Sequence, residues 1–187
     1  MQIRSAQKED YKSVALLIIQ AMDDLAMKFT KSSEVEKAVP VFEYFFQQEG
    51  NQYSFENTLV FEENGEIIGS ITGYDGNKLK ELRTPFLEYV LEKFGFEQIP
   101  EDETESGEFY LDTISVSRIH QGKGIGRKLI EAMIQHAKEK GFDKVGLLVD
   151  RENPDAKRLY AKIGFKFVKI KILMGGSYEH LVYEFQN

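Results

Sequence analysis

The chain has 187 residues, of which 42% are hydrophobic, and this length and composition favour one folded domain with a sizeable core. Its 31 acidic and 24 basic side chains give a net charge of −7, which argues against general nucleic-acid binding because such binding depends on lysine and arginine. Cysteine is absent, which excludes disulfides and thiolate nucleophiles. There is no apolar signal core near the start and no run of roughly 18–20 apolar residues, so we expect a soluble cytoplasmic protein without a membrane partner.

The first part of the chain predicts a strand followed by two helices. Residues Gln2–Ala6 are short and compatible with a strand, and apolar residues recur at helical spacing from Asp10 to Leu25. Ser32 or Ser33 can cap a second helix that runs toward Gln48. Its aromatic stripe is expected to lie in the core.

A hairpin and an unusual segment come next. The sequence TLVFEENGEIIGSITGY has two β-branched runs around Asn64 and Gly65, a pair that tolerates the positive φ angles of a tight turn. The pattern then changes over 77–107, where Thr84 and Pro85 look like the cap and the first residue of a helix. This segment is longer than a minimal connection between the third and fourth strands, so we interpret it as an insertion.

An acidic run closes that segment. It contains four carboxylates within five residues, at Glu101, Asp102, Glu103 and Glu105. Most such runs are solvated loops, and this is the interpretation we favour. The alternative is that the run attracts an ammonium group to the mouth of a site.

The second half predicts alternating strands and helices. Strands are expected over 109–116, 144–149, 167–173 and 179–185, and helices after the turn QGKGIG and over 153–163. Together with the hairpin, this order predicts a mixed α/β sheet with helices on both faces.

The turn QGKGIG carries the first chemical signal. Backbone N–H groups at a helix start have no partner inside the helix and can bind an anion. Glycine lets a phosphate approach closely, and Lys123, Arg127 and Lys128 add positive charge. The turn therefore predicts a pyrophosphate site.

Two other nucleotide-binding motifs fit this turn less well. A P-loop requires Gly-Lys-Ser/Thr where Arg127, Lys128 and Leu129 stand. A dinucleotide fingerprint requires a final glycine near Arg127, although Asp150 imitates its ribose-binding acid. The dinucleotide interpretation stays open as a minor alternative.

The segment LDTISVSRIHQGKGIGRKLI resembles motif A of the GNAT (Gcn5-related N-acetyltransferase) family, whose Q/R-x-x-G-x-G/A signature is met by Gln121, Gly124 and Gly126. The resemblance implies that the chain uses acetyl-coenzyme A (acetyl-CoA), with the pyrophosphate held by the turn and the pantetheine arm held by the backbone of the preceding strand. The implied cofactor-binding residues are Ile114, Ser115, Val116, Gln121, Gly122, Lys123, Gly124, Ile125, Gly126 and Arg127.

A second segment, NPDAKRLYAKIGF, is similar to GNAT motif B, with Asn153, Tyr160, Gly164 and Phe165 at the matching positions. The resemblance implies that Asn153 contacts the cofactor and that the Tyr160 hydroxyl protonates the departing thiolate. From the residues alone, Asn153 is equally a helix cap, and Tyr160 on an apolar helical face is equally a core aromatic.

Both motifs stand in the family's order, so the resemblance covers roughly 2–185. It implies one domain over 1–187, with a mixed, mostly antiparallel sheet of about six to seven strands, helices on both faces and the insertion at 77–107. It also implies transfer of an acetyl group to a primary amine of a small molecule, peptide or protein.

The general base is the least direct of these expectations. Some family members carry a glutamate where Tyr110 stands here, and a phenol cannot replace a carboxylate base. Asp112 lies two residues further on the same strand face and is our candidate substitute, with a structural hydrogen-bonding role as its alternative. Glu108 or a water relay are the other candidates for the base. Backbone N–H groups near Ile114 and Ser115 can stabilise the oxyanion if the strand bulges there.

The remaining expectations concern partners and alternatives. His120, His136 and His180 show no metal-ligand spacing, so no metal site is expected. A non-catalytic acyl-CoA-binding module is the competing function, because the strand glutamate is absent. A homodimer is possible through the last strands, where residues 169–185 give a β pattern.

Overall fold

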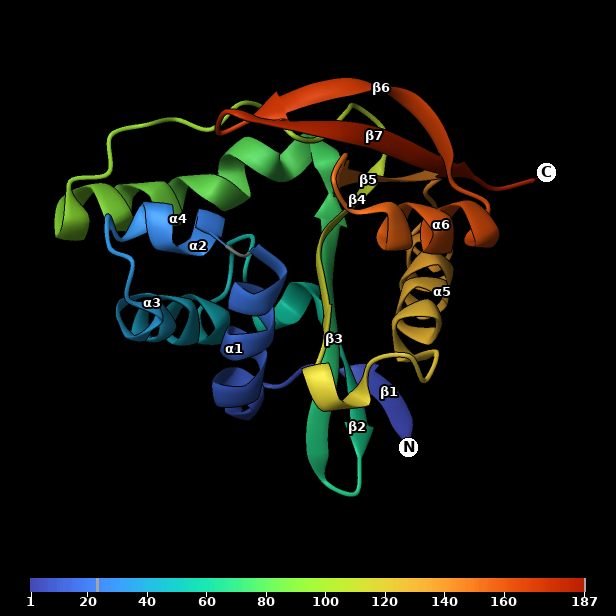
Figure 1. Ribbon diagram of the computed structural model, residues 1–187, viewed down its shortest axis with the longest axis horizontal. Helices are drawn as coiled ribbons and strands as arrows, with labels where there is room; N and C mark the ends of the chain where they lie inside the picture. The colour runs from blue at the N-terminus through green and yellow to red at the C-terminus, as the bar shows by residue number, and fades with distance from the viewer. Residues whose placement is uncertain (23, 187) are drawn as a thin grey trace.

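The computed structural model describes residues 1–22 and 24–186, which form a seven-stranded sheet in the order β1-β2-β3-β4-β5-β7-β6 (Figure 1). Neighbouring strands pair antiparallel except β4 and β5, which are parallel. The mixed, mostly antiparallel sheet is thereby confirmed. The strands are β1 Gln2–Ser5, β2 Thr58–Glu63, β3 Glu66–Asp75, β4 Phe109–Val116, β5 Lys144–Asp150, β6 Lys166–Leu173 and β7 Gly176–Glu184.

Helices cover both faces of the sheet, as predicted. One face carries the first four helices and the other carries the last two (Figure 1). No helix in the described part of the chain is long and apolar enough to cross a membrane. The helices are α1 Tyr11–Met22, α2 Asp24–Phe29, α3 Val35–Gln47, α4 Leu79–Phe94, α5 Ile125–Glu139 and α6 Pro154–Ile163.

The core on the α1–α4 face is rich in aromatic rings. Phe86 of α4 meets Phe42 and Phe45 of α3 and Tyr53 of the following loop, with ring centroids 4.8–5.6 Å apart. Each edge-to-face pair adds about 0.5–1.5 kcal/mol beyond the burial of its area. The aromatic stripe expected in the core is confirmed, and it fixes α4 against α3.

Two helix starts differ from the sequence prediction. Helix α4 begins at Leu79, so Pro85 lies inside it, and the Thr84 hydroxyl donates to the Lys80 carbonyl rather than capping a helix start. The short turn before α4 supplies the start instead, because the Asp75 carboxylate accepts from the Asn77 N–H. Burial of the helical turn before Pro85 stabilises α4 by more than the loss of the backbone hydrogen bond that a proline cannot donate.

The predicted second helix, which runs toward Gln48, is capped differently as well. Its N-cap is Glu34, the residue just before the helix. The Ser32 Oγ accepts a hydrogen bond from the Glu34 N–H, so this serine bonds to the cap residue and not to the first turn. The first predicted helix, which was expected to reach Leu25, is divided into α1 and α2, and residue 23 between them lies outside the described residues.

Strand β4 departs from regular pairing on both of its edges. Toward β3, Thr113 pairs with Thr72 and Leu111 with Gly73, so Asp112 is the extra residue of a β-bulge. Toward β5, the parallel pairing stops at Leu111, and β5 continues only with β7. The two central strands therefore separate, and the expected bulge lies at Asp112, just before Ile114.

Candidate active site

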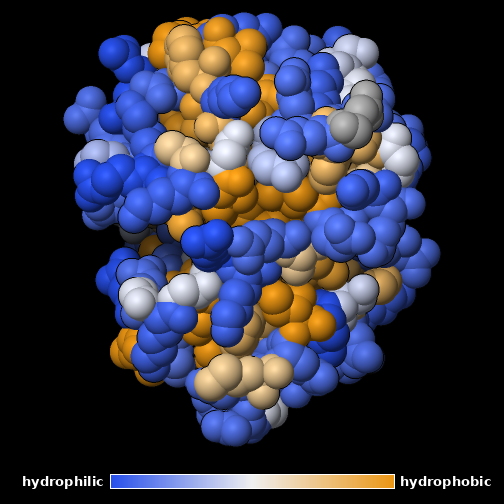
Figure 2. All heavy atoms as spheres, turned by 90° about the vertical axis from the view of Figure 1, so that its right-hand side faces the viewer, coloured by the Kyte–Doolittle hydropathy of each residue, from blue (hydrophilic) through white to orange (hydrophobic). Residues whose placement is uncertain are grey.

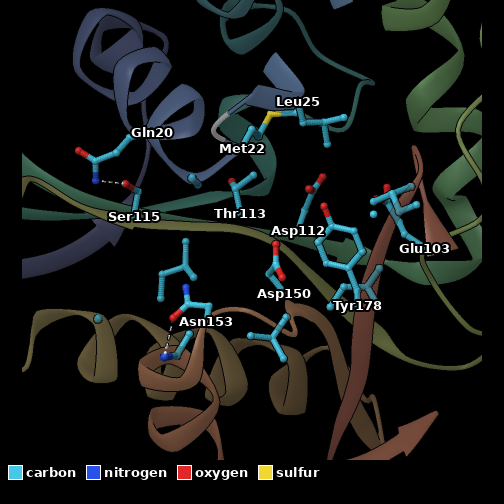
Figure 3. A pocket seen from close by; sticks show the side chains of 18 of the residues that line it. Gln20, Met22, Leu25, Glu103, Asp112, Thr113, Ser115, Asp150, Asn153 and Tyr178 are labelled. Atoms are coloured by element: carbon cyan, nitrogen blue, oxygen red, sulfur yellow. Dashed lines mark hydrogen bonds between the residues drawn. The ribbon is translucent and has the colours of Figure 1, made fainter. Parts of the chain in front are cut away.

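A cleft of about 1250 Å³ occupies the space where β4 and β5 separate. The ends of both strands, the start of α5 and the start of α6 line it, and α1, α2 and α4 close its opposite wall. Figure 3 shows side chains from these elements turned toward one common space. Every residue predicted for cofactor binding lines this cleft except Lys123, which is exposed beside it.

The glycine-rich turn brings unpaired N–H groups to one end of the cleft. Gly122 and Gly124 have φ angles of 76° and 77°, which L side chains rarely adopt. Gly124 is the N-cap of α5 and offers no side chain to the first turn, and the first intrahelical bond recorded there is from the Lys128 N–H. The N–H groups before Lys128 are available to an anion, so the residues present fit a pyrophosphate.

Strand β4 continues the cleft from this turn. Ile114, Ser115 and Val116 all line it, and none of the three pairs with β5. Gln20 of α1 donates its amide to Ser115 Oγ at 2.7 Å and to the Val116 carbonyl at 2.9 Å. Gln121 also donates to the Val116 carbonyl, at 3.0 Å. These contacts fix the strand edge, and nothing in the sequence pattern identified Gln20.

Helix α6 contributes Asn153 and Tyr160. Asn153 is the N-cap, because its Oδ1 accepts from the Ala156 N–H at 3.0 Å, and Figure 3 shows its side chain at the cleft wall. Tyr160 is 7% exposed, and burial raises the pKa of its phenol to about 12. Tyr160 packs with Phe165, so it is both a core aromatic and a cleft residue. At neutral pH it holds its proton and can donate it.

Asp112 lies further along the cleft, beyond the β4 edge residues. Its Oδ2 accepts from the Tyr74 hydroxyl at 3.1 Å and from the Gln52 amide at 3.3 Å. Burial raises the pKa of Asp112 to about 6, although these two hydrogen bonds act to lower it. A carboxyl group with this pKa is ionised at neutral pH and basic enough to accept a proton. The bulge turns this side chain into the cleft.

Glu103 is another carboxyl group that lines the cleft, and it comes from the acidic run. Its side chain is 9% exposed, and burial together with the negative charge of Asp112 raises its pKa to about 8. Figure 3 draws it on the side of the pocket where Asp112 and Tyr178 lie. Nothing in the sequence distinguishes it from its acidic neighbours.

The interpretation of the acidic run as a solvated loop is wrong for Glu103, which is buried, although Glu101 and Asp102 remain exposed. Glu101 accepts from the Met174 N–H at 2.8 Å, and Asp102 pairs with Arg83 at 3.0 Å. Glu105 pairs with Lys169 at 2.6 Å and Lys171 at 2.7 Å of strand β6. These contacts hold the run against β6 and α4, and they position Glu103.

Glu108, the alternative base, lies outside the cleft. It is fully buried, and its Oε2 lies 3.0 Å from His180 Nε2 of β7, while its Oε1 accepts from the Glu105 N–H at 2.8 Å. Tyr110, where other members carry the glutamate, does line the cleft, and burial holds the pKa of its phenol well above the usual range. Of the two acidic candidates, Glu108 and Asp112, only Asp112 lines the cleft.

This geometry defines a class of protein: an α/β fold with an anion cradle at one end of a cleft and buried acid–base groups further along it. A model of the acetyltransferase (GNAT) family matches residues 19–165. The chain therefore belongs to the GNAT family, whose cofactor is acetyl-CoA.

A curated acetyltransferase is similar to part of this chain. A spermine/spermidine N(1)-acetyltransferase of Bacillus subtilis (strain 168) is 34% identical over 68 residues, which are 36% of this chain and 45% of that protein. The chain thus matches less than half the length of this curated relative.

Two crystal structures match nearly the whole chain. One, described as an acetyltransferase, is 34% identical with a TM-score of 0.83 and covers 98% of this chain and 99% of its own. An N-acetyltransferase from Staphylococcus aureus Mu50 has a TM-score of 0.87 at 24% identity, covers 98% of this chain and 100% of its own, and shows the fold alone.

Proposed function

We propose that this chain is an acetyl-CoA-dependent N-acetyltransferase that acetylates a primary amine of a small molecule, peptide or protein. The observation that carries the proposal is one continuous cleft, which joins the unpaired N–H groups of the α5 start to Tyr160 and Asp112. Transfer to an amine needs a cofactor anchor, a base and an acid, and this cleft offers a candidate for each.

The cofactor fits one half of the cleft by its chemistry. The first turn of α5 suits the pyrophosphate, and the edge of β4 at Ile114–Val116, which β5 does not cover, suits the amide groups of the pantetheine arm. The cofactor supplies an acetyl thioester, whose carbonyl carbon forms a C–N bond with the amine while the C–S bond breaks. Asn153 lies at the wall between these two regions.

Asp112 is the proposed base. An amine reaches the cleft chiefly as an ammonium ion, which must lose a proton before its nitrogen can attack. Asp112 takes that proton and passes it to solvent, and the hydrogen bonds from Tyr74 and Gln52 hold the carboxylate in place. Its pKa of about 6 keeps the accepting form populated at neutral pH.

Tyr160 is the proposed acid. Its phenol holds its proton at physiological pH, as an ordinary tyrosine does, and burial, which raises its pKa to about 12, strengthens this preference. It gives its proton to the leaving sulfur and regains one from the nitrogen as the amide forms, so the protons balance. Backbone N–H groups after the bulge, near Ile114 and Ser115, are the proposed oxyanion donors.

Residues 77–107 are proposed to be an insertion into a single domain that spans 1–187. Arg83, Phe86, Leu87, Pro100 and Glu103 from this segment line the cleft on the side away from the glycine-rich turn. The insertion thus forms the acceptor side of the site. The final strands are the proposed homodimer contact, because β6 is an edge strand with exposed apolar side chains.

Calorimetric titration with acetyl-CoA and desulfo-CoA tests the cofactor site. We expect micromolar binding to the wild type and its loss in Gly124→Glu, which places a carboxylate at the anion cradle. An amine panel then separates the enzyme from the competing function, a binding module without catalysis. Turnover that falls about 100-fold or more in Tyr160→Phe, with unchanged cofactor affinity, supports the proposal. Binding without turnover of any amine favours the module.

A further inference from the structure

Glu103 is a buried carboxyl group without a partner. It is 9% exposed, and the described residues supply neither a hydrogen bond nor an ion pair to its side-chain oxygens. A buried carboxyl group normally has one, because its desolvation is otherwise uncompensated. Since Glu103 faces the cleft rather than the core, its missing partner can come from a ligand.

The neighbouring cations are already engaged elsewhere. Arg83, which also lines the cleft, donates to Asp102 at 3.0 Å and to the Glu101 carbonyl at 3.1 Å. Lys171 pairs with Glu105 at 2.7 Å and donates to the Asp102 and Thr104 carbonyls. Both cations thereby hold the acidic run in position and leave the carboxyl group of Glu103 free.

The place of Glu103 in the cleft indicates which ligand group it serves. The cofactor cradle lies toward Gln20 and Ser115, and in Figure 3 Asp112, Tyr178 and Glu103 follow in the opposite direction. Glu103 lies beyond Asp112, so it could bind the reacting amine only by competing with Asp112 for it. A cation further along the same acceptor molecule has no such conflict.

We propose that Glu103 binds a second cationic group of the acceptor, so that the preferred substrate is a linear amine bearing a distal ammonium or guanidinium group. The proposal rests on the function proposed above and adds a substrate class to it. The aromatic ring of Tyr178 between the two carboxyl groups offers an apolar wall to the carbon chain that joins the two cations. A cation placed beside Glu103 favours the ionised form of this carboxyl group, and the resulting charge-assisted contact makes the second cation a determinant of affinity and specificity.

Matched substrates test this class directly. Linear α,ω-diamines from propane to octane are compared with the monoamines of the same length, which lack only the second ammonium. After correction for two reactive ends, we expect kcat/KM of the wild type to favour at least one diamine about tenfold or more. In Glu103→Gln that preference is expected to disappear through a higher KM for the diamine.

Three further measurements keep the outcomes distinct. Glu97→Gln removes an exposed carboxylate from the same segment outside the cleft and should keep the preference. Calorimetric binding of the diamine with desulfo-CoA present reports the subsite without turnover. Thermal melting checks folding, and Glu103→Gln should be no less stable than the wild type, because it removes an unpaired buried acid.

The two proposals fail in different ways. Equal kcat/KM for diamines and monoamines, or a preference that survives Glu103→Gln, overturns the second-cation subsite while leaving N-acetyltransfer intact. Cofactor binding without turnover of any amine overturns the catalytic proposal instead. In that case, diamine binding that weakens at least tenfold in Glu103→Gln still supports the subsite. Diamine binding that is absent, or that does not weaken in the variant, overturns the subsite as well.

Discussion

The position of Asp112 and the pKa of its side chain both suit it to accept a proton. As the extra residue of the β4 bulge, it leaves the pairing of the sheet and enters the cleft, where Tyr74 and Gln52 orient it. Asp112→Asn keeps the size and one acceptor but removes the base. We expect kcat/KM to fall roughly 100-fold or more and the acidic limb of its pH profile, near pH 6 in the wild type, to disappear.

The measurement is the pH dependence of kcat/KM for wild type and variant at saturating acetyl-CoA. Cofactor affinity by calorimetry serves as the control, because Asp112 lies away from the anion cradle. An unchanged pH profile in Asp112→Asn means that another group or a water relay takes the proton.

The raised pKa of Glu103 also predicts how the free energy of unfolding depends on pH. Burial raises its pKa from 4.5 to about 8, with Asp112 and Asp102 adding to the rise and Arg83 and Lys171 opposing it. An acid with a raised folded-state pKa releases its proton first in the unfolded chain, so its contribution to stability is lost as pH rises through this interval. We expect the free energy of unfolding to decline from pH 5 to pH 8, and less steeply in Glu103→Gln.

Urea unfolding at both pH values measures this difference. Glu97→Gln, an exposed acid of the same segment, should keep the wild-type slope. Equal slopes in wild type and Glu103→Gln would mean that the carboxyl group is ionised in the folded protein as readily as in the unfolded chain.

At the scale of elements, the close contact of β4, β5 and β7 depends on one glycine. The carboxylate of Glu108 lies where a Cβ at Gly146 of β5 would stand, and the same carboxylate pairs with His180 of β7. Gly146→Ala therefore forces a side chain into an occupied, fully buried space. We expect it to lower the free energy of unfolding by about 1–3 kcal/mol.

A double-mutant cycle with Glu108→Ala checks the steric cause by urea unfolding. Removing the carboxylate makes room for the new methyl group, so the double variant should lose less stability than the sum of the two single variants. Additive losses would contradict the steric explanation.

The elements also show what sequence reasoning could reach. The glycine-rich turn and the Asn-Pro start of α6 were predictable, because the backbone conformations of Gly124 and Asn153 are set by local sequence. The start of α4 was not predictable, because Pro85 is tolerated only through packing of the earlier turn. Glu103 was hidden for a similar reason: the acidic run is held in place by tertiary contacts, which its neighbours make with Arg83 and Lys171.

For the whole molecule, strand β6 is the surface that most needs an explanation. It is the outer strand of the sheet, and Phe167, Val168, Ile170 and Ile172 are all about half exposed. Figure 2 shows hydrophobic residues gathered at the top of the molecule, where β6 lies in Figure 1. An apolar edge strand left in water invites pairing with another chain.

A second copy of this chain is the proposed partner, and light scattering after size exclusion tests it. We expect the wild type to run as a dimer and Ile170→Lys, at a residue 44% exposed, to run as a monomer, because the charge would be buried in the contact. Leu91→Lys, at a residue 49% exposed on α4, adds the same charge elsewhere and should leave the dimer intact. Both variants should bind acetyl-CoA as the wild type does, because neither residue lines the cleft. A monomeric wild type at micromolar concentration would leave β6 as the surface for a different partner.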